Sequence, residues 1–538
     1  MNKSIRWMAA AGVLTAVLSG CFPSPKQQAL ESITAMDLKH HLDILAADEF
    51  RGRDTPSPEL KIASRYLAVM AECYGLKPLL PDGSFLQAIP LTVTEVNAVR
   101  TEMSFRSPRG NRDFTYLRDF GLQGRGLSST RVSGRVIFLG LGLSAPDLEW
   151  DDIGELDLDG TIVILLDPDL PEDHSLMTTE TRRLVRRRAW SVLQEGAAGV
   201  LTVISEDREN RLQGAGHVFS PARDIALGSV QQSGVVPAVS RQSSLRAEIR
   251  HDMAAALLGI SRSQLGSMFA ALREGDRVPA RVIRGGRLDI EIATQERTDT
   301  TYNVVAWLEG ADDLLKEEYV LIGSHHDHLG AREGRVYNGA DDNGSGTVAM
   351  LEIAQALAIA RPKRSVVLVW HTAEEKGLWG ARFFVENSPI PVEKISAQIN
   401  LDMISRNDPD SIYLIGSRIL STELDEALRH VNALDTQLGF DYTYEDPKHP
   451  DRFFFRSDHY PYIQYGIPAA WLFCGTTEDY HQETDTVSRV DFEKMAAVTR
   501  LAYGSVLYIG NLPELLALDA HTEITSRGVH NTKISWRY

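Results

Sequence analysis

The sequence predicts an α/β fold: a doubly wound, mostly parallel sheet with a smaller, β-rich domain inserted into it. Three observations predict it. From Tyr319 onward, short apolar runs alternate with stretches of helical periodicity. Histidine, aspartate or glutamate follows several of these apolar runs, and composition changes to closely spaced β-like runs between residues 116 and 284. Alternating strands and helices are typical of a parallel sheet covered by helices on both faces.

Length and charge limit the class of protein. A chain of 538 residues is too long for one ordinary domain, so two are expected. Its 43% hydrophobic content allows a large core, and its 24% charged content is ordinary for a soluble protein. With 56 basic and 73 acidic residues the net charge is −17, which argues against general binding of nucleic acid.

The N-terminus has the pattern of a signal peptide. Lys3 and Arg6 precede the twelve-residue apolar stretch Trp7–Leu18. Such a stretch is too short to span a bilayer and is typical of a signal-peptide core. The first residues are therefore expected to direct export and to lie outside the folded domains.

The stretch Leu18–Cys21 (LSGC) resembles a bacterial lipobox. The resemblance implies that residues 1–20 are removed, that Cys21 is lipidated, and that residues 21–31 form a tether. Phe22 follows the cysteine, which favours the outer membrane as the place of this envelope lipoprotein. The alternative is an ordinary signal peptide in which Cys21 has no special role.

The remaining elements follow in order along the chain. Ser32–Gly75 has helical spacing with a break at Arg51–Pro58, and Leu76–Val93 contains a loop and a first strand. The pattern then predicts strands over Tyr319–Ser324, Ser365–His371, Ile395–Met403, Ile412–Gly416 and Ala469–Phe473, and helices over Ser345–Ala360, Gly377–Asn387 and Ser421–Leu438.

The inserted region has a recognisable sequence of elements. Two β-like runs, Val132–Leu141 and Gly160–Asp167, precede an arginine-rich helix over Glu180–Glu195 and the run GAAGVL. This order over Arg131–Ser240 resembles the protease-associated domain, a module often inserted into secreted peptidases. The Arg182–Arg188 cluster on the helix is either a solvated face or a site for an acidic partner.

These patterns divide the chain into five parts. The main domain is discontinuous and comprises residues 32–115 and 285–515. Residues 116–284 form the inserted domain with its connections, and residues 516–538 form a C-terminal tail. The signal peptide, residues 1–20, and the tether, residues 21–31, are the other two parts.

Side chains suited to metal binding lie after the predicted strands. His325 and Asp327 follow the strand that begins at Tyr319, and Asp402 ends the strand that begins at Ile395. Loops after the carboxyl ends of parallel strands meet at one edge of the sheet. Imidazole and carboxylate ligands together suit a borderline metal such as zinc. The sequence therefore predicts a metal centre at this edge.

Five motifs occur in a fixed order: GSHHDH, GADDNGSG, AEEKGLWG, NLDM and YHQETDT. Together they resemble the co-catalytic zinc exopeptidase family, which includes bacterial secreted aminopeptidases and glutamate carboxypeptidases. The resemblance covers Ser32–Val93 and Asp289–Asn511. It implies a peptide substrate and two Zn²⁺ ions, although other divalent metals could serve.

The resemblance implies a ligand for each motif. One zinc would take His325 and Asp402, the other would take Glu375 and His481, and Asp341 would be shared. The Asp341–Asp342 peptide is often cis in this family. Two ions held in this way polarise a substrate carbonyl together.

Three further residues receive roles from the resemblance. Glu374, beside the ligand Glu375, would be the general base and then the general acid. Asp327 would orient the imidazole of His325. Tyr480 resembles the tyrosine that stabilises the oxyanion in several relatives.

The neighbouring polar residues have structural interpretations. His326 and His328 are expected to pack in the loop, and His371 to be a core histidine. Asp342, Asp458 and His459 are expected to support the loops. Phe453–Phe455 with Tyr460 and Tyr462 are equally consistent with a specificity pocket and with core packing.

Four functions remain to be weighed, with an aminopeptidase favoured. A carboxypeptidase or dipeptidase would need a cation for the substrate carboxylate, for which Arg406 and Arg418 are candidates. A single-zinc cyclase similar to glutaminyl cyclase and a non-catalytic scaffold are less consistent with an intact ligand set. Cys73 and Cys474 are equally consistent with a disulfide and with two free thiols.

Overall fold

The computed structural model describes residues 23–124, 126–171, 173–214, 216, 218–228 and 245–519. The predicted signal peptide 1–20, the lipidation site Cys21, and the part of the predicted tail beyond residue 519 lie outside the described residues. Within these described ranges, no helix is both long enough and apolar enough to cross a membrane.

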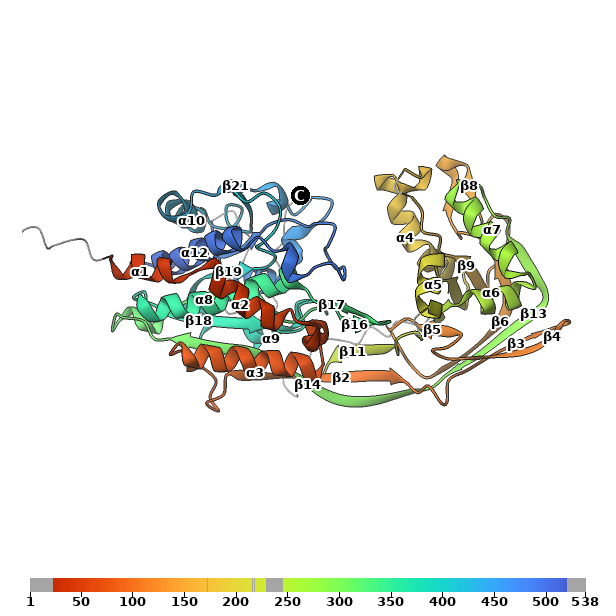
Figure 1. Ribbon diagram of the computed structural model, residues 1–538, viewed down its shortest axis with the longest axis horizontal. Coiled ribbons are helices and arrows are strands. Elements are labelled where there is room, and N and C mark those ends of the chain that lie inside the picture. The colour runs from red at the N-terminus through yellow and green to blue at the C-terminus, as the bar shows by residue number, and fades with distance from the viewer. Residues whose placement is uncertain are drawn as a thin grey trace, which may run out of the picture. The chain divides into compact units, whose positions relative to one another are not determined.

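The chain forms two compact units (Figure 1). Unit 1 comprises Met1–Ile89, Thr300–Ala331 and Arg335–Tyr538, and unit 2 comprises Pro90–Asp299 and Arg332–Gly334. The inserted unit therefore begins earlier and ends later than the predicted bounds of residues 116–284. The reason is strand pairing, because β3 (Glu102–Ser107) pairs with both β4 (Gly110–Thr115) and β13 (Arg281–Ile292) in the sheet of unit 2.

Unit 1 is built on a mixed sheet with a parallel centre, which confirms the predicted doubly wound α/β class. The adjacent strands β18 (Ser365–His371), β15 (Tyr319–His325), β19 (Ile395–Leu401) and β22 (Ala469–Phe473) are all parallel. The pairs that flank this centre are antiparallel. In unit 1 the order continues with β14 (Thr294–Leu308) beside β18, with β20 (Ser411–Ile415) and β21 (Gly439–Asp441) beyond β22, and with β1 (Lys77–Pro78) on β14. The same ladder runs on from β14 to β2 (Leu86–Val96) and β11 (Arg223–Leu227), of which β11 and the part of β2 from Pro90 onward belong to unit 2.

Successive residues of each central strand enter different cores, as the period of two in a strand requires. In β18, Val366, Leu368 and Trp370 belong to one hydrophobic cluster, whereas Val367 and Val369 belong to the other. Complete burial of such side chains stabilises the fold by about 1.5–3 kcal/mol each. The first cluster includes residues of α1 (Pro25–Ser32), α2 (Ala35–Leu45), α3 (Pro58–Cys73), α8 (Gly346–Ile359), α10 (Thr422–Asp435) and α12 (Phe492–Ile509), and the second includes residues of α9 (Trp379–Glu386) and α11 (His459–Gln464).

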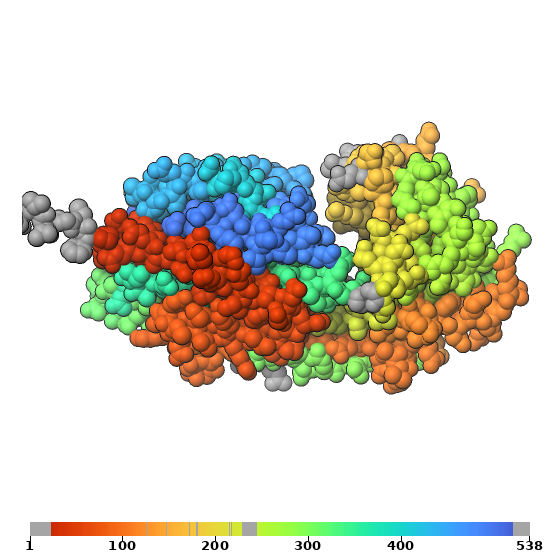
Figure 2. Space-filling view, in the orientation of Figure 1, coloured from red at the N-terminus to blue at the C-terminus, as the bar shows by residue number. Residues whose placement is uncertain are grey.

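The first and last helices of the described part of unit 1 lie side by side. Figure 2 shows the N-terminal helices (red to orange) beside the C-terminal helix (blue). Arg500 of α12 donates from Nη2 to the carbonyl oxygen of Ile33, at 2.6 Å, and from Nε to that of Leu30. The segment before the insertion is therefore an integral part of unit 1.

Capping residues fix where the N-terminal helices begin. The Ser57 side chain accepts a hydrogen bond from the Leu60 amide, and Pro58 occupies the first turn of α3. Thr34 caps α2 in the same way through the Asp37 amide. The predicted break in helical spacing is confirmed as the connection between these two helices, where η1 (Asp48–Arg53) lies.

In the residues of unit 2 that the structure describes, there is an eight-stranded sheet and there are four α-helices. The order is β4-β3-β13-β6-β9-β10-β12-β5, in which β6, β9, β10 and β12 are parallel neighbours. The predicted strands and arginine-rich helix of this region are present, and its identity as a protease-associated domain stays a prediction. Its remaining elements are β5 (Phe120–Leu122), β6 (Thr130–Phe138), β9 (Ile162–Leu166), β10 (Gly199–Val203), β12 (Leu245–Ile249), α4 (Thr179–Gln194), α5 (Glu206–Gly214), α6 (His251–Leu258) and α7 (Arg262–Arg273).

The structure decides between the two interpretations of the cysteines. Cys73 is exposed on α3, Cys474 is buried after β22, and both are free thiols. Burial raises the pKa of the Cys474 thiol to about 12, so this residue is an unreactive part of the core.

Glu352 of α8 is an ionisable group in the core of unit 1. Its side chain is fully buried, and neither carboxylate oxygen accepts a hydrogen bond from the described part of the chain. The nearest histidine is His41, whose Nε2 lies 3.7 Å from Oε1 and whose pKa is lowered by burial. Burial, with a smaller contribution from Asp37, raises the pKa of Glu352 to about 7.

We predict that Glu352→Gln stabilises the protein above pH 7. Because the pKa is raised on folding, the folded state holds a proton that the unfolded state releases, and stability falls as pH rises from about 4.5 to about 7. The variant should gain up to about 3 kcal/mol in the free energy of unfolding at pH 8 and little at pH 5. Urea unfolding at both pH values measures this, with the exposed α3 substitution Glu72→Gln as control. An equal effect at the two pH values would contradict a buried proton at Glu352.

Candidate active site

The predicted metal-binding residues lie at the carboxyl ends of the central strands. His325 is the last residue of β15, and Asp402 directly follows β19. Glu374 and Glu375 follow β18, and His481 lies in the loop after β22. Because these four strands are parallel neighbours, their following loops meet at one edge of the sheet.

His325 faces two carboxylates. Its Nε2 lies 3.3 Å from Oδ1 of Asp402 and 3.5 Å from Oδ1 of Asp342. All three side chains are buried. The predicted pairing of His325 with Asp402 is therefore present, and Asp342 is the second carboxylate that His325 faces.

Asp342 is the carboxylate between the two histidines of the site. Its Oδ1 faces His325, and its Oδ2 lies 3.1 Å from Nε2 of His481. A carboxylate whose two oxygens face different histidines is suited to be shared by two metals. The prediction of Asp341 as the shared ligand is thus wrong by one residue, and the cis peptide is Asp342–Asn343 instead of Asp341–Asp342.

Asp341 points into the protein and supports the loops. Its Oδ1 accepts hydrogen bonds from the amide and the hydroxyl of Ser405, at 3.0 and 2.6 Å. Its own amide donates to Asp485, as does the amide of Asp342. Burial and the neighbouring Asp485 raise the pKa of Asp341 to about 7. The backbone turns these two consecutive carboxylates in different directions, so that Asp341 faces Ser405 and Asp342 faces the histidines.

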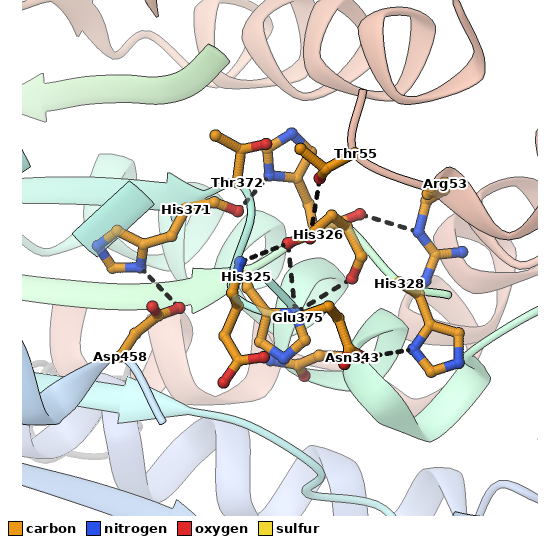
Figure 3. Close-up of polar contacts among 12 residues, drawn as sticks. Arg53, Thr55, His325, His326, His328, Asn343, His371, Thr372, Glu375 and Asp458 are labelled. Carbon is orange, nitrogen blue, oxygen red and sulfur yellow. Dashed lines mark hydrogen bonds and ion pairs between the residues drawn. The ribbon is translucent and has the colours of Figure 1, made fainter. Parts of the chain in front are cut away.

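Glu375 contacts two histidines, His481 and His328. Its Oε2 lies 3.4 Å from Nε2 of His481, and its Oε1 lies 2.9 Å from Nδ1 of His328. His328 was expected to be a loop residue, but its imidazole contacts the predicted ligand directly. Figure 3 shows His328 beside Glu375.

Glu374 and Asp327 lie next to the His325 group. Ligand atoms of His325, Glu374 and Asp402 all lie within 4.8 Å of one another, as do those of His328, Asp342 and Glu375. His325 Nδ1 is 3.1 Å from the main-chain oxygen of Asp327 and 3.8 Å from its carboxylate. The predicted orienting contact of Asp327 is therefore made mainly by its carbonyl group.

The site has an excess of buried negative charge. Burial lowers the pKa of His325, but Asp402, Glu374 and Asp342 together raise it well above its ordinary value. The pKa of His481 is raised to about 10 against the effect of burial, by Asp342 and Glu375. Burial and nearby Glu375 also raise the pKa of Glu374 well above its usual range.

A divalent metal fits this donor set. Carboxylates and histidine nitrogens are ligands that zinc takes in proteins, and here two buried aspartates and two partly buried glutamates lie beside the histidines. A cation would also offset the charge excess that raises the pKa values of both histidines. We therefore regard the two groups of donors as the candidate metal centre.

A small cavity opens beside these donors. Phe453, Trp471 and Phe473 form its aromatic lining, and Arg456 and Tyr480 also contribute to it. Tyr480 stacks on His481 with ring centroids 3.9 Å apart. Its hydroxyl oxygen accepts a hydrogen bond from Nη2 of Arg456, at 3.0 Å. The site thus combines polar donors with an apolar wall.

Only part of the predicted aromatic group lines this cavity. Phe453 does, whereas the hydroxyl of Tyr462 lies 2.8 Å from Nε2 of the buried His371. Nδ1 of His371 lies 3.2 Å from Asp458, which confirms a core histidine with a supporting aspartate. His326 is likewise a packing residue, since its imidazole contacts Ser64 and the carbonyl oxygen of His371.

The two arginines considered as carboxylate clamps lie elsewhere. Arg406 pairs with the buried Asp479 at 2.6 Å. Arg418 pairs with Glu445 and lies over the ring of Tyr442. The cation that lines the cavity is Arg456, which precedes the motif SDH, and its place directly before that segment is the one sequence feature that could have indicated it.

The fold and this edge of the sheet define an α/β protein with a candidate two-group metal centre. Comparison with known families agrees, because residues 303–506 match the model of Peptidase family M28. The match confirms the resemblance to the co-catalytic zinc exopeptidase family for this part of the chain.

Known proteins resemble the chain in sequence and in fold. Leucine aminopeptidase 2 of Arthroderma otae is 26% identical over 265 residues, covering 43% of this chain and 50% of that protein. The probable leucine aminopeptidase 2 of Aspergillus oryzae is 30% identical over 229 residues, covering 41% and 44%. The chain thus spans about half the length of the curated relatives it matches.

Two solved structures share the fold over most of the chain. The zinc aminopeptidase BSAP from Bacillus subtilis has a TM-score of 0.54 at 16% identity, covering 88% of this chain and 94% of that one. The aminopeptidase from Aneurinibacillus sp. strain AM-1 has a TM-score of 0.52 at 17% identity, covering 92% and 98%.

We predict that Asp342→Asn weakens zinc binding far more than Asp341→Asn does. Asp342 faces both histidines, whereas Asp341 binds Ser405 and is already inclined to hold a proton. Loss of a supporting residue around a metal costs about 10–100-fold in affinity, so Asp342→Asn should exceed that range and Asp341→Asn should stay near or below its lower end. Titration of metal-depleted protein with zinc against a chromophoric chelator measures both constants. The reverse order would restore Asp341 as the ligand.

Proposed function

We propose that the protein is a metal-dependent exopeptidase, and that it acts as an aminopeptidase. Support comes first from Asp342, whose two oxygens face His325 and His481. The M28 match and the similarity to leucine aminopeptidases favour the same activity. The position of Asp342 between His325 and His481 is the single observation on which the proposal depends.

We further propose that the centre holds two zinc ions. His325 and Asp402 would hold one, Glu375 and His481 would hold the other, and Asp342 would be shared. Bound zinc supplies Lewis acidity, which polarises a carbonyl oxygen and makes water a stronger acid. His328 adjoins Glu375 and would keep that carboxylate ionised, since its hydrogen bond, with that of His481, lowers the pKa of Glu375 well below its usual value despite burial.

Glu374 is the proposed acid–base residue. Its carboxylate lies among the donors of the His325 group. It would take a proton from the attacking water and deliver it to the leaving amine. Transfer in both directions suits a carboxyl group whose pKa is raised above its ordinary value.

Tyr480 is the proposed donor to the substrate carbonyl. Burial raises the pKa of its phenol above the ordinary value, so the hydroxyl keeps its proton. Because Arg456 donates to the phenolic oxygen, that proton is available to another acceptor at the cavity. A hydroxyl held in this way can stabilise a developing oxyanion.

Arg456 favours one alternative, a carboxypeptidase or dipeptidase. A guanidinium at the cavity could bind the carboxylate of a substrate. The names of the relatives and the aromatic wall, which suits an apolar side chain, favour the aminopeptidase. A single-zinc cyclase would leave one of the two donor groups without a role, and a non-catalytic scaffold would leave both.

The surrounding organisation belongs to the same proposal. We propose that Cys21 carries a lipid anchor that holds the protein in the bacterial envelope, at the outer membrane. We also propose that unit 2 is a protease-associated domain. Its parallel strands β6, β9 and β10 with the arginine-rich α4 are the elements that support this.

Hydrolysis of a matched peptide panel tests the activity. The set contains one apolar peptide with free termini, with a blocked N-terminus and with a blocked C-terminus. An aminopeptidase should cleave the first and third only, and a chelator should abolish cleavage that added zinc restores. Cleavage of the N-blocked but not the C-blocked peptide would support the carboxypeptidase, and no cleavage of any peptide would refute an exopeptidase.

We predict that Glu374→Gln keeps zinc and the fold but loses most of the activity, by about 10²–10⁴-fold in kcat. The amide preserves the size of the side chain and removes its ability to accept a proton. Zinc content, thermal unfolding and peptide turnover are compared with those of the unaltered protein. The general-base role would be abandoned if the variant turned over at the original rate.

We predict that Cys21→Ser releases the protein from the membrane. The hydroxyl cannot take the thioether-linked lipid, so the chain should move from the membrane fraction to the soluble fraction of the envelope, with its peptidase activity retained. Membrane fractionation, with and without globomycin, provides the measurement. Membrane association that persisted unchanged in Cys21→Ser would rule out this anchor.

A further inference from the structure

A short segment before the insertion, Gly52–Thr55, lies beside the candidate metal centre. It falls within unit 1 and outside residues 303–506, which match the family model. Figure 3 shows Arg53 and Thr55 beside His325, His326 and His328. From its sequence, this segment is predicted only to be a break between helices.

Arg53 connects three separate parts of the chain through main-chain carbonyl groups. Its guanidinium donates from Nε to His326, from Nη1 to Asn338 and from Nη2 to Gly339, at 2.9, 2.8 and 2.9 Å. Nη1 also donates to Leu45 at 2.7 Å. The first partner adjoins His325, and the next two lead into the Asp342 loop. The rigid fork of a guanidinium suits such simultaneous contacts, which an ammonium cannot reproduce.

The Arg53 side chain is completely buried, which makes its charge expensive unless it is compensated. Burial lowers its pKa to about 10, while Asp485, Asp327, Asp342 and Glu375 act in the opposite direction. The guanidinium thus stays charged near neutral pH and offsets part of the negative charge at the site. A purely apolar support would provide neither the carbonyl contacts nor this charge.

Thr55 reaches Glu374 through Asp327. The Thr55 hydroxyl donates to Oδ2 of Asp327 at 2.9 Å, and the Glu374 amide donates to Oδ1 of the same carboxylate at 3.1 Å. Thr55 and Asp327 are both fully buried. The position of the Glu374 backbone therefore depends on a carboxylate that Thr55 holds in place.

The remaining residues of the segment make equally close contacts. The amide of His328 donates to the Arg53 carbonyl oxygen at 3.1 Å, and Asp54 pairs with Lys376 at 2.7 Å. Gly52 has a φ of +68°, and a Cβ there would lie 2.2 Å from the carbonyl oxygen of Tyr337. Only glycine allows the chain to pass this closely to the neighbouring loop.

We propose that Arg53 and Thr55 are positioning residues of the metal centre, which hold the His325–His328, Asn338–Asp342 and Glu374–Glu375 segments in the arrangement that binds zinc. This inference rests on the proposed function and adds to it residues that the ligand motifs do not contain. The segment 52–55 acts through the ligands and the general base and does not itself contact the metal.

The decisive variant is Thr55→Val, which keeps the shape of the side chain and removes the donor to Asp327. Thr55→Ser restores the donor. The matched control is Thr499→Val, since the fully buried Thr499 hydroxyl donates to the Met495 carbonyl oxygen within α12 at 2.7 Å. All three variants are prepared as the full chain, and zinc affinity, kcat, KM and the midpoint of thermal unfolding are measured for each.

Thr55→Val is expected to weaken zinc binding or lower kcat by about 10–100-fold, with little change in KM. Thr55→Ser should recover most of the loss. Thr499→Val should lower the unfolding midpoint without changing zinc affinity or kcat. The inference is overturned if Thr55→Val binds zinc and turns over like Thr499→Val, or if Thr55→Ser is as impaired as Thr55→Val.

Arg53→Lys and Arg53→Met give an independent test, in which lysine keeps the charge but loses the fork. Zinc affinity should fall in the order arginine, lysine, methionine, and unchanged affinity in a folded Arg53→Met would refute the role of Arg53. If Arg53→Met does not fold, the Thr55 series alone decides. Failure of the proposed function can be distinguished from failure of this inference. If the protein cleaves no peptide, the proposed activity is refuted. If Thr55→Val and Thr55→Ser still differ in zinc affinity, the positioning role of Thr55 stands.

Discussion

Mutual repulsion among four carboxylates, two of them buried and two partly buried, is the constraint on which this structure depends. Asp342, Glu374, Glu375 and Asp402 converge at one edge of the unit 1 sheet, where the two aspartates are buried and the two glutamates are partly buried. Their combined field raises the pKa of His325 well above its ordinary value although burial opposes this. Side chains that repel one another stay together only if the backbone holds them rigidly and if positive charge compensates them.

The sheet provides the rigidity. Four parallel strands buried on both faces fix the start of each ligand-bearing loop, and the helices on either side leave the strands no freedom to shift in register. The compensating charge comes from histidines, from the buried Arg53 and, in the proposed enzyme, from zinc. The same carboxylates that make the site costly to fold without a metal thus give it affinity for one.

The segment Gly52–Thr55 contributes to this rigidity and charge compensation. Residues 52–55 precede the ligand motifs by some 270 positions in the chain, as the separation of 272 between Thr55 and Asp327 illustrates. Unit 2 is inserted between them in the sequence, and β2 and β14 carry the chain out of unit 1 and back into it. A discontinuous domain can therefore complete its site with residues from both sides of the insertion.

The sequence by itself determined the fold class, the strands that bear the site and the set of motifs around the metal centre. Apolar runs report burial directly, and the residues that follow them must lie at the edge of a parallel sheet. Only the tertiary structure decided between Asp341 and Asp342, since both neighbours have the same chemistry and the local backbone alone sets which one faces the histidines. It also decided the contact of His328 with Glu375 and the place of Arg456 at the cavity. The sequence patterns also did not predict the helix α12. This helix is buried on nearly all sides, so it lacks the polar face by which helical periodicity is recognised. The roles of Arg53 and Thr55 depend on contacts between distant segments, and no local pattern records such contacts.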